Sequence, residues 1–364
     1  MIAKPQAIIN LSALRHNVEV VKRASPIAKI LAVIKADAYG HGLAAVAATL
    51  GQQQLTDGFA VARLSEALVL RGQGFKQKVV VLTGFLTPED LELAVENKID
   101  IVLHNESQLE LLETVRLENS IGIWLKINTG MNRLGIEVSQ FGGFINRLEQ
   151  LEKIRKPVNL MTHLACADEL GEQKTKTKKQ IETFDEAVNA TQGEQSIANS
   201  AGLLAWPNAQ RHWVRPGIML YGASPFTDVT ADKYDLKPVM TLKSFVLNIR
   251  DVKKGGRVGY GGSWLAKKTT RIATIGIGYG DGYPRHANEG TPVLIGTQQA
   301  KLVGRVSMDS ITVDISQCEN IAIADEVVLW GEGLPVDIIA QHSGTISYEL
   351  FCGVSARVPR IYQN

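Results

Sequence analysis

The sequence lacks the features that mark membrane, secreted and nucleic-acid-binding proteins. No stretch approaches about 20 uninterrupted apolar residues, so no membrane-spanning helix is predicted. The first residues, MIAKPQA, contain no apolar core of a secretory signal peptide. The net charge is only +2, and no block of basic residues indicates a nucleic-acid partner. We therefore predict a cytoplasmic protein with no membrane partner and no nucleic-acid partner.

Cysteine is scarce, and its pattern predicts neither disulfides nor a metal site. The chain has three cysteines, Cys166, Cys318 and Cys352. An odd number of widely spaced cysteines without metal-ligand spacing is typical of reduced thiols in a reducing compartment. We predict no bound metal.

The length and composition fit a globular enzyme with two domains. The chain has 364 residues, of which 45% are hydrophobic and 21% charged. This length exceeds what one hydrophobic core usually organises. The pattern of apolar residues changes near residue 230, so we predict one domain over residues 1–230 and a second over residues 231–364.

The first domain alternates strands with helices. After a short strand at residues 7–10 and a helix from Ser12, eight strand-then-helix units follow. Their strands are expected at residues 28–34, 58–62, 79–84, 100–105, 122–128, 158–163, 195–199 and 212–215. Such alternation predicts a parallel sheet, and eight units favour a closed (β/α)8 barrel of the TIM type. An open, doubly wound sheet is the alternative.

Polar residues follow several of these apolar strands. In a barrel, the ends of parallel strands meet at one rim, where catalytic residues gather. The residues expected there are Lys35, Lys126, Asn128, Thr162, His163, Asn199, Ser200 and Arg215. Ser200 and the backbone of Gly217 and Ile218 then form a natural phosphate site.

Lys35 itself permits two interpretations. It ends the apolar run AKILAVI at residues 28–34 and begins the segment KADAYGHG at residues 35–42. A lysine at the end of a buried strand either extends to solvent or lies in a pocket that disfavours its charge. The second environment is typical of amine nucleophiles and Schiff-base lysines.

The second domain has little helical periodicity. Short strands are expected at residues 240–252, 271–276, 292–295, 301–306, 311–315 and 326–330. Glycine-rich segments with embedded tyrosines, at Tyr260, Tyr279 and Tyr283, lie between them. These features predict a mainly β domain.

Read together, these segments resemble bacterial alanine racemases, which are fold type III pyridoxal-phosphate enzymes. The resemblance begins at Lys35 and extends over essentially the whole chain. It is carried by KINTGMNRLG (126–135), THLACAD (162–168), NS (199–200), RPG (215–217), VGYG (258–261), GYGDG (278–282), VSMD (306–309) and TISYE (345–349). The family fold, a (β/α)8 barrel followed by a β domain, matches the expectation above.

The resemblance implies pyridoxal 5′-phosphate bound to Lys35 and a set of supporting residues. Tyr39, Ser200, Gly217, Ile218 and Tyr348 would hold the phosphate, with Asn199 and His163 also at the cofactor. Arg215 would face the pyridine nitrogen, while Arg133 and the backbone N–H of Met308 would bind the substrate carboxylate. Tyr260 would be the second catalytic base, supplied by the other subunit of a head-to-tail homodimer.

The expected reaction explains why these residue types are needed. Racemisation removes the α-proton from one face of alanine and returns a proton to the other, so Lys35 and Tyr260 would act from opposite faces. Positive charge nearby favours the deprotonated forms of lysine and tyrosine side chains. Arginine is not a proton donor, so Arg215 would leave the pyridine nitrogen unprotonated.

Two positions on the strand expected at residues 122–128, Lys126 and Asn128, affect the charge of the site. The resemblance implies a carbamylated Lys126 that braces Arg133, with a plain lysine in an ion network as the alternative. Family members commonly have aspartate where this chain has Asn128, which changes the local charge.

The function expected from the resemblance is interconversion of L- and D-alanine, for peptidoglycan synthesis or for alanine catabolism. A broader-specificity amino-acid racemase is the first alternative. A decarboxylase is disfavoured by Arg215, and a non-catalytic pyridoxal-phosphate-binding protein is disfavoured by the β domain with Tyr260 and Tyr348.

Overall fold

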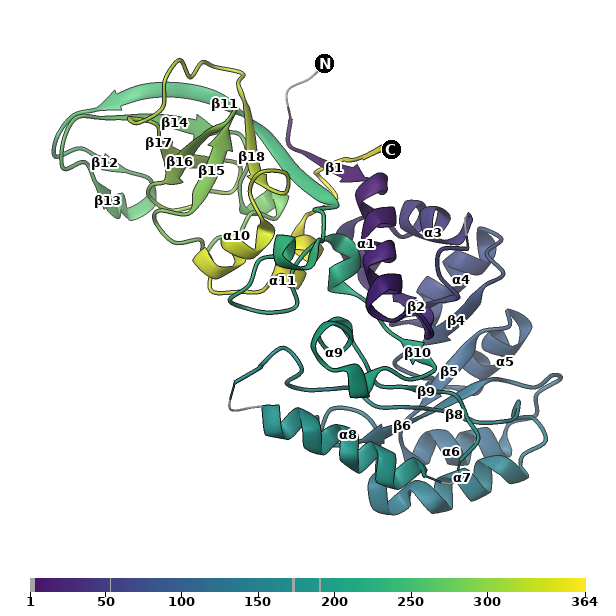
Figure 1. Cartoon of the computed structure of the whole chain (residues 1–364). Helices are drawn as coiled ribbons and strands as arrows, with labels where there is room; N and C mark the ends of the chain where they lie inside the picture. Colours follow the sequence, from purple (N-terminus) through teal and green to yellow (C-terminus); the bar gives the residue numbers. More distant parts are fainter. Residues whose placement is uncertain (1–3, 53, 172–173, 190) are drawn as a thin grey trace. The chain divides into compact units, whose positions relative to one another are not determined.

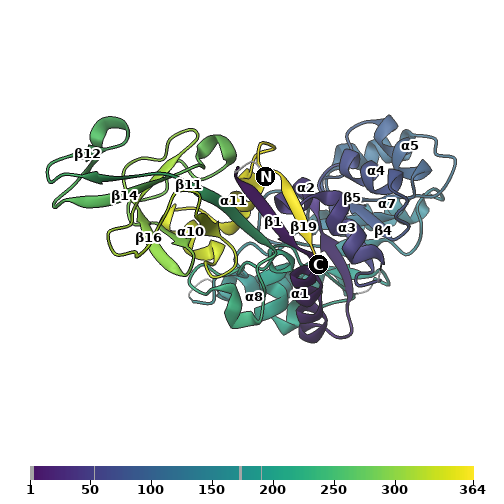
Figure 2. The same cartoon turned by 90° about the horizontal axis from the view of Figure 1, so that it is seen from above.

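The computed structural model describes residues 4–52, 54–171, 174–189 and 191–364. The chain forms two compact units (Figures 1 and 2). The barrel unit comprises Val18–Ala38 and Leu43–Gly217, and the sheet unit comprises Met1–Asn17, Tyr39–Gly42 and Ile218–Asn364. The predicted boundary between residues 230 and 231 stays a prediction.

The barrel unit contains the predicted closed parallel barrel. Its strands are β2 (Lys29–Val33), β3 (Gly58–Val61), β4 (Lys78–Val81), β5 (Asp100–Leu103), β6 (Ile123–Asn128), β8 (Asn159–Met161), β9 (Gln195–Ser196) and β10 (Trp213–Val214). Each pairs with its neighbours, and the pairing of β10 with β2 closes the ring. Closure confirms the barrel and excludes the open sheet. A short strand, β7 (Ile136–Glu137), pairs parallel with the end of β6.

Helices follow the barrel strands in the predicted rhythm (Figure 1). They are α2 (Lys35–Gly40), α3 (Leu43–Gln52), α4 (Leu64–Gly72), α5 (Pro88–Glu96), α6 (Glu106–Thr114), α7 (Phe141–Gln150), α8 (Lys174–Val188) and α9 (Ser200–Ala205), with η1 (Val138–Gln140) and η2 (Pro207–Ala209). Polar side chains cap the N-termini of several helices. The side chain of Thr87 accepts a backbone N–H at the start of α5, and that of Asn105 does so at the start of α6. None of the helices in the described ranges is long and apolar enough to cross a membrane.

An ion network lies at the N-terminal ends of the barrel strands, opposite the C-terminal ends where the catalytic residues are expected. Asp100, the first residue of β5, is buried and accepts from Lys78 Nζ at 2.7 Å and from Arg155 Nη1 at 3.1 Å. Gly122 lies directly beside it, since a Cβ at that position would be 2.2 Å from the carboxylate. The glycine is therefore needed for this close approach.

The sheet unit is built around the long strand β11 (Met240–Val252). A closed ring of strands runs from β11 through β14 (Thr270–Ile275), β17 (Ile311–Asp314), β16 (Gln298–Leu302), β15 (Pro292–Ile295) and β18 (Glu326–Trp330) back to β11. Five of the six predicted strands are confirmed to within a residue at each end, whereas the one expected at residues 301–306 lies at residues 298–302 and shares only two residues with the prediction. A small hairpin of β12 (Arg257–Val258) and β13 (Trp264–Leu265) is separate.

The two chain ends complete this sheet. β1 (Gln6–Asn10) pairs antiparallel with β11 and parallel with β19 (Arg360–Gln363), and Figure 2 shows β1 and β19 side by side. Other elements are α1 (Leu11–Ala24), η3 (Ile218–Tyr221), η4 (Ala231–Tyr234), η5 (Tyr260–Gly262), η6 (Tyr279–Asp281), α10 (Val336–His342) and α11 (Ser347–Gly353). The strand at residues 7–10 was predicted, but its pairing partners were not.

Candidate active site

Basic side chains gather at the C-terminal ends of the barrel strands. Lys35 follows β2, Lys126 lies near the end of β6, and Arg215 follows β10 directly. Arg133 lies in the loop after β6, and His163 follows β8. The charges of Arg215, Arg133 and Lys35 lower the pKa values of Lys126 and His163.

Lys126 is buried among cations. Burial, followed by the charges of Arg215, Arg133 and Lys35, lowers the pKa of Lys126 from 10.5 to about 8. Lys126 is buried, and no carboxylate is among the groups that shift its pKa. With this pKa, roughly a tenth of the amine is neutral at pH 7, far more than for an ordinary lysine.

Arg215 is held by neutral acceptors. Its Nη1 donates to Ser196 Oγ at 2.6 Å, and its Nη2 donates to the carbonyls of Thr162 at 2.6 Å and Ile197 at 3.1 Å. Burial lowers the pKa of Arg215 to about 10, which still leaves the guanidinium charged at neutral pH. The site therefore contains a fixed, buried positive charge.

His163 is kept neutral by the same neighbours. Its Nδ1 lies 3.3 Å from Nη2 of Arg215. Burial and then the charge of Arg215 lower the pKa of His163 well below its ordinary value. An arginine cannot accept a hydrogen bond, so the contact with Arg215 favours the tautomer whose proton is on Nε2.

Polar groups lie close together after the ends of β9 and β10, at Asn199, Ser200 and Gly217. Ser200 Oγ accepts from the Gly217 amide at 2.9 Å, and both belong to the barrel unit. Asn199 caps α9 by accepting from the Gly202 amide at 2.9 Å. The structure thus gives Asn199 a structural role at the start of this helix.

The segment after Lys35 has an unusual backbone. Ala36, Asp37, Ala38 and Tyr39 have φ values of 54°, 54°, 52° and 53°. A left-handed conformation costs an L-residue roughly 1–2 kcal/mol, and consecutive non-glycine examples are rare. The sequence contains no glycine at these four positions, so no signal in it predicted α2 to be left-handed.

A cluster of tyrosines lies in the sheet unit. Tyr39 stacks on Tyr221 with ring centroids 4.7 Å apart and lies 5.8 Å from the ring of Tyr348. Burial, with smaller contributions from Tyr348 and Cys352, raises the pKa of Tyr39 far above its ordinary value. Tyr39 therefore keeps its proton and can donate a hydrogen bond. Ile218 is buried at the start of η3 in the same unit.

Two other predicted residues of the sheet unit are exposed. Tyr260 on η5 is 69% exposed, and Met308 is 52% exposed. A backbone hydrogen bond holds the loop that contains Met308: the Met308 carbonyl accepts from the Gly280 amide at 2.9 Å. A Cβ at Gly278 would lie 2.2 Å from the Ser307 carbonyl, so that position requires glycine.

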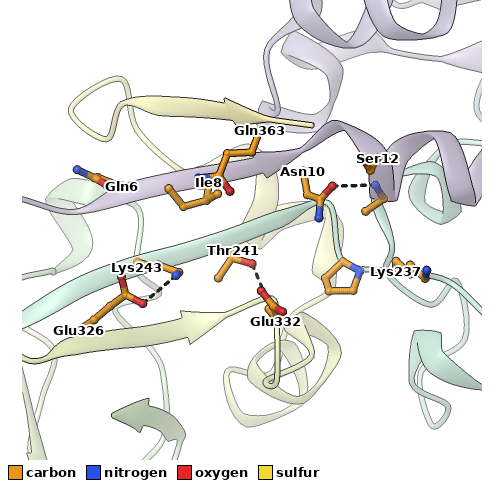
Figure 3. Close-up of a pocket in the computed structure, with 12 residues that line it drawn as sticks. Gln6, Ile8, Asn10, Ser12, Lys237, Thr241, Lys243, Glu326, Glu332 and Gln363 are labelled. Carbon is orange, nitrogen blue, oxygen red and sulfur yellow. Dashed lines mark hydrogen bonds and ion pairs between the residues drawn. The ribbon is translucent and has the colours of Figure 1, made fainter. Parts of the chain in front are cut away.

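A separate polar pocket of about 480 Å³ lies in the sheet unit (Figure 3). Its residues include Lys243, paired with Glu326 at 2.8 Å, and Thr241, whose Oγ1 accepts from the Glu332 amide. It contains none of the predicted site residues.

Comparison with known proteins identifies the family. The descriptions "Alanine racemase, N-terminal domain" and "Alanine racemase, C-terminal domain" match residues 9–225 and 239–362. An alanine racemase of Vibrio cholerae is 48% identical over 357 residues, which are 98% of this chain and 97% of that protein. One of Aeromonas hydrophila is 49% identical over 352 residues, 97% of each.

The chain belongs to the alanine racemase family. Solved structures agree: the biosynthetic alanine racemase of Pseudomonas aeruginosa superposes with a TM-score of 0.96 at 40% identity, covering 100% of both chains. That of Streptomyces lavendulae gives 0.89 at 28% identity, covering 100% of this chain and 98% of the other. The predicted family, fold class and enzyme class, an amino-acid isomerase, are confirmed.

Asn128, the departure from the expected alanine racemase pattern, organises the loop that carries Arg133. Its Oδ1 accepts from the amides of Gly130 at 3.2 Å and Asn132 at 3.0 Å. Its Nδ2 donates to Glu137 at 3.1 Å. An aspartate could keep the first two contacts but would repel Glu137, so the asparagine fits this chain's own surroundings.

Several supporting residues were not identified from the sequence. Ser196 accepts from Arg215, beside the carbonyl of Thr162, which was expected at the rim, and buried Gln180 donates to the His163 carbonyl at 3.1 Å. The only signal for Ser196 was its position in the strand expected at residues 195–199, and the only signal for Gln180 was its position on the helix after β8. Glu66, which accepts from the Ala36 amide at 2.6 Å, is a further case.

Proposed function

We propose that this member of the alanine racemase family interconverts L- and D-alanine, with pyridoxal 5′-phosphate held at Lys35. The observation that carries the proposal is the excess of positive charge at the strand ends. Burial and cations are the causes of the shifts at Lys126 and His163, and carboxylates are not among them. A phosphorylated cofactor and an amino-acid carboxylate both supply the negative charge that such a site needs.

The residues available fit the cofactor. Ser200 and the Gly217 and Ile218 backbone, with Tyr39 and Tyr348, would hold its phosphate, and Asn199 and His163 would lie beside it. Arg215 would face its ring nitrogen, where a guanidinium fixed by neutral acceptors cannot protonate it. When bound, the cofactor supplies an electron sink for the carbanion left by loss of the α-proton.

Lys35 and Tyr260 would move the proton. One takes it from one face of the amino acid, and the other returns a proton to the opposite face. Arg133 and the Met308 amide would orient the substrate carboxylate. Exposure of Tyr260 and Met308 supports their contribution to a partner's site in a head-to-tail homodimer.

Lys126 is the residue proposed to be carbamylated. A neutral amine is the form that reacts with carbon dioxide, and a pKa of about 8 makes it available. The resulting carbamate is an anion among the cations Arg133 and Arg215. A cytoplasmic enzyme of this kind would supply D-alanine for peptidoglycan or serve alanine catabolism.

The activity is tested by measuring racemisation of alanine beside serine, lysine and arginine. We expect kcat/KM for alanine to exceed the others by at least about 100-fold, as a small pocket discriminates by size. Comparable turnover of lysine or arginine would favour the broader-specificity racemase. Absence of turnover with retained cofactor binding would favour a non-catalytic binding protein.

A second test addresses the two bases. Tyr260→Phe should lower abstraction of the α-proton from one alanine enantiomer by about 10²–10⁴-fold, the usual contribution of a general base. Abstraction from the other enantiomer, in deuterium-exchange measurements, should change far less. Equal, mild losses with both enantiomers would contradict a two-base mechanism.

A further inference from the structure

The left-handed turn after Lys35 must be held by contacts, because its own residues disfavour it. Four consecutive non-glycine residues, from Ala36 to Tyr39, have φ between 52° and 54°. Within the barrel unit, the Ala38 amide donates to the Ile34 carbonyl at 2.9 Å, and Asp37 accepts from the Leu43 amide at 2.7 Å. A further contact comes from another strand–helix unit.

That contact is made by Glu66. Its Oε1 accepts from the Ala36 amide at 2.6 Å. Its Oε2 accepts from the amides of Ala62 at 2.8 Å and Arg63 at 3.0 Å, at the start of α4. One half-buried carboxylate thus joins the peptide directly after Lys35 to the end of the neighbouring strand β3.

Helix capping accounts for only part of this arrangement. In the next unit, Asp90 accepts from the amides of Leu86 at 2.9 Å and Thr87 at 3.2 Å, at the start of α5. In the unit after that, Gln108 accepts from the His104 amide at 2.9 Å. In the described residues neither of these caps accepts from the backbone of another strand–helix unit. The bond from Ala36 is therefore additional to capping.

We propose that Glu66 is a positioning residue that fixes the backbone of Lys35 by holding the left-handed turn at Ala36. The proposal rests on the assignment of Lys35 as the cofactor lysine. The carboxylate of Glu66 uses one oxygen for the Ala36 amide and the other for the amides that begin α4. A glutamine has only one acceptor oxygen, and its amino group cannot accept. Gln108 shows that glutamine is able to cap, so Glu66→Gln removes the Ala36 contact selectively.

The test compares Glu66→Gln with Asp90→Ala, which removes a cap of the same kind without a contact to the turn. Amide hydrogen exchange of the cofactor-free protein is measured over residues 35–42, and then the Kd for pyridoxal phosphate. We expect Glu66→Gln to speed exchange in this segment and to raise the Kd about tenfold, the effect of one lost charge-assisted hydrogen bond. Asp90→Ala should speed exchange only near residues 86–90 and leave the Kd within about twofold of wild type.

Ala36→Gly provides the second arm. Glycine adopts the left-handed conformation without strain, so adding Ala36→Gly to Glu66→Gln should recover part of the lost cofactor affinity. Unchanged exchange and Kd in Glu66→Gln, equal effects in Asp90→Ala, or no recovery with Ala36→Gly would overturn the proposal. If the wild-type protein binds no cofactor at Lys35, the proposed function fails, while the exchange comparison still decides whether Glu66 holds the turn.

Discussion

Arg215 illustrates how single residues set the chemistry of the site. Its guanidinium is fully buried, and the described groups that hold it are a hydroxyl, two carbonyls and an imidazole nitrogen. Its charge is therefore not cancelled by a carboxylate contact. The uncancelled charge strengthens the binding of an anionic ligand. It also lowers the pKa of neighbouring cations such as Lys126.

The first prediction at the residue scale concerns Lys126. Its folded pKa of about 8 lies below the ordinary 10.5, so below pH 8 its buried charge destabilises the fold. Between pH 8 and 10.5 the unfolded chain binds more protons, and this penalty, at most about 3 kcal/mol, is lost as pH rises. Lys126→Met should therefore be stabilising at pH 7, with an advantage that shrinks toward pH 10.5.

Urea unfolding in buffers free of carbon dioxide measures this effect. Lys254→Met, at an exposed position, is the control and should leave the pH profile unchanged. Parallel profiles for wild type and Lys126→Met would contradict the depressed pKa.

Ser196 gives the second residue-scale prediction. Its hydroxyl accepts from Arg215 and donates to the Trp213 carbonyl at 2.9 Å. Ser196→Ala leaves a buried guanidinium N–H without its acceptor, at a cost of about 1–3 kcal/mol in unfolding free energy. Chemical denaturation checks the value, and a change below 0.3 kcal/mol, less than typical for one buried hydrogen bond, would show that water replaces the hydroxyl.

At the scale of elements, the barrel strands have a chemical end and a structural end. Lys35, Lys126 and Arg215 lie at the C-terminal ends, and Asp100 with its two cations lies at the N-terminal ends. In barrels of this type the first end carries catalysis and the second carries stability. Substitutions at the two ends should therefore affect different properties.

Asp100→Asn tests this separation. The substitution removes the charge from two ion pairs around a buried carboxylate and should destabilise the fold by about 2–4 kcal/mol. The kcat at 25 °C should stay within about twofold, since the site lies at the other end of the strands. Glu19→Gln, in the exposed pair with Lys22, is the control and should change stability by less than about 1 kcal/mol. A large fall in kcat for folded Asp100→Asn would contradict the separation.

Elements also show where reasoning from sequence succeeds. The eight barrel strands are short, apolar and separated by helical patterns, so local composition located them. The left-handed α2 was not foreseen because residues 36–39 contain no glycine and the turn depends on Glu66, a distant residue in the chain. The Asp100 network was missed because charges at strand ends resemble ordinary surface residues.

At the scale of the whole molecule, the pairing of strands far apart in the chain could not be predicted from the sequence. β1 joins β11 and β19, which are separated from it by more than 200 residues of chain. Motifs, by contrast, led to the family directly, because many of them occur in order along the chain. Which residues share one site in the assembled enzyme needs a test of its own.

Mixing of inactive subunits provides that test. In a head-to-tail dimer, a Lys35→Ala subunit and a Tyr260→Phe subunit combine to form one doubly altered site and one intact site. Random exchange should then restore about a quarter of wild-type activity, as half the dimers are hybrids with one active site each. Activity no higher than the average of the two parents would place both bases in the same subunit.

The central claim is that Lys35 carries the cofactor, and borohydride reduction tests it most directly. The protein reconstituted with pyridoxal phosphate is reduced, its visible absorbance is followed, and the labelled peptide is sequenced by mass spectrometry. Lys126→Met is treated in parallel to exclude the neighbouring lysine. We predict that the visible band bleaches and that the label lies on Lys35 in both proteins. A label on Lys126, or no label on Lys35, would contradict the account.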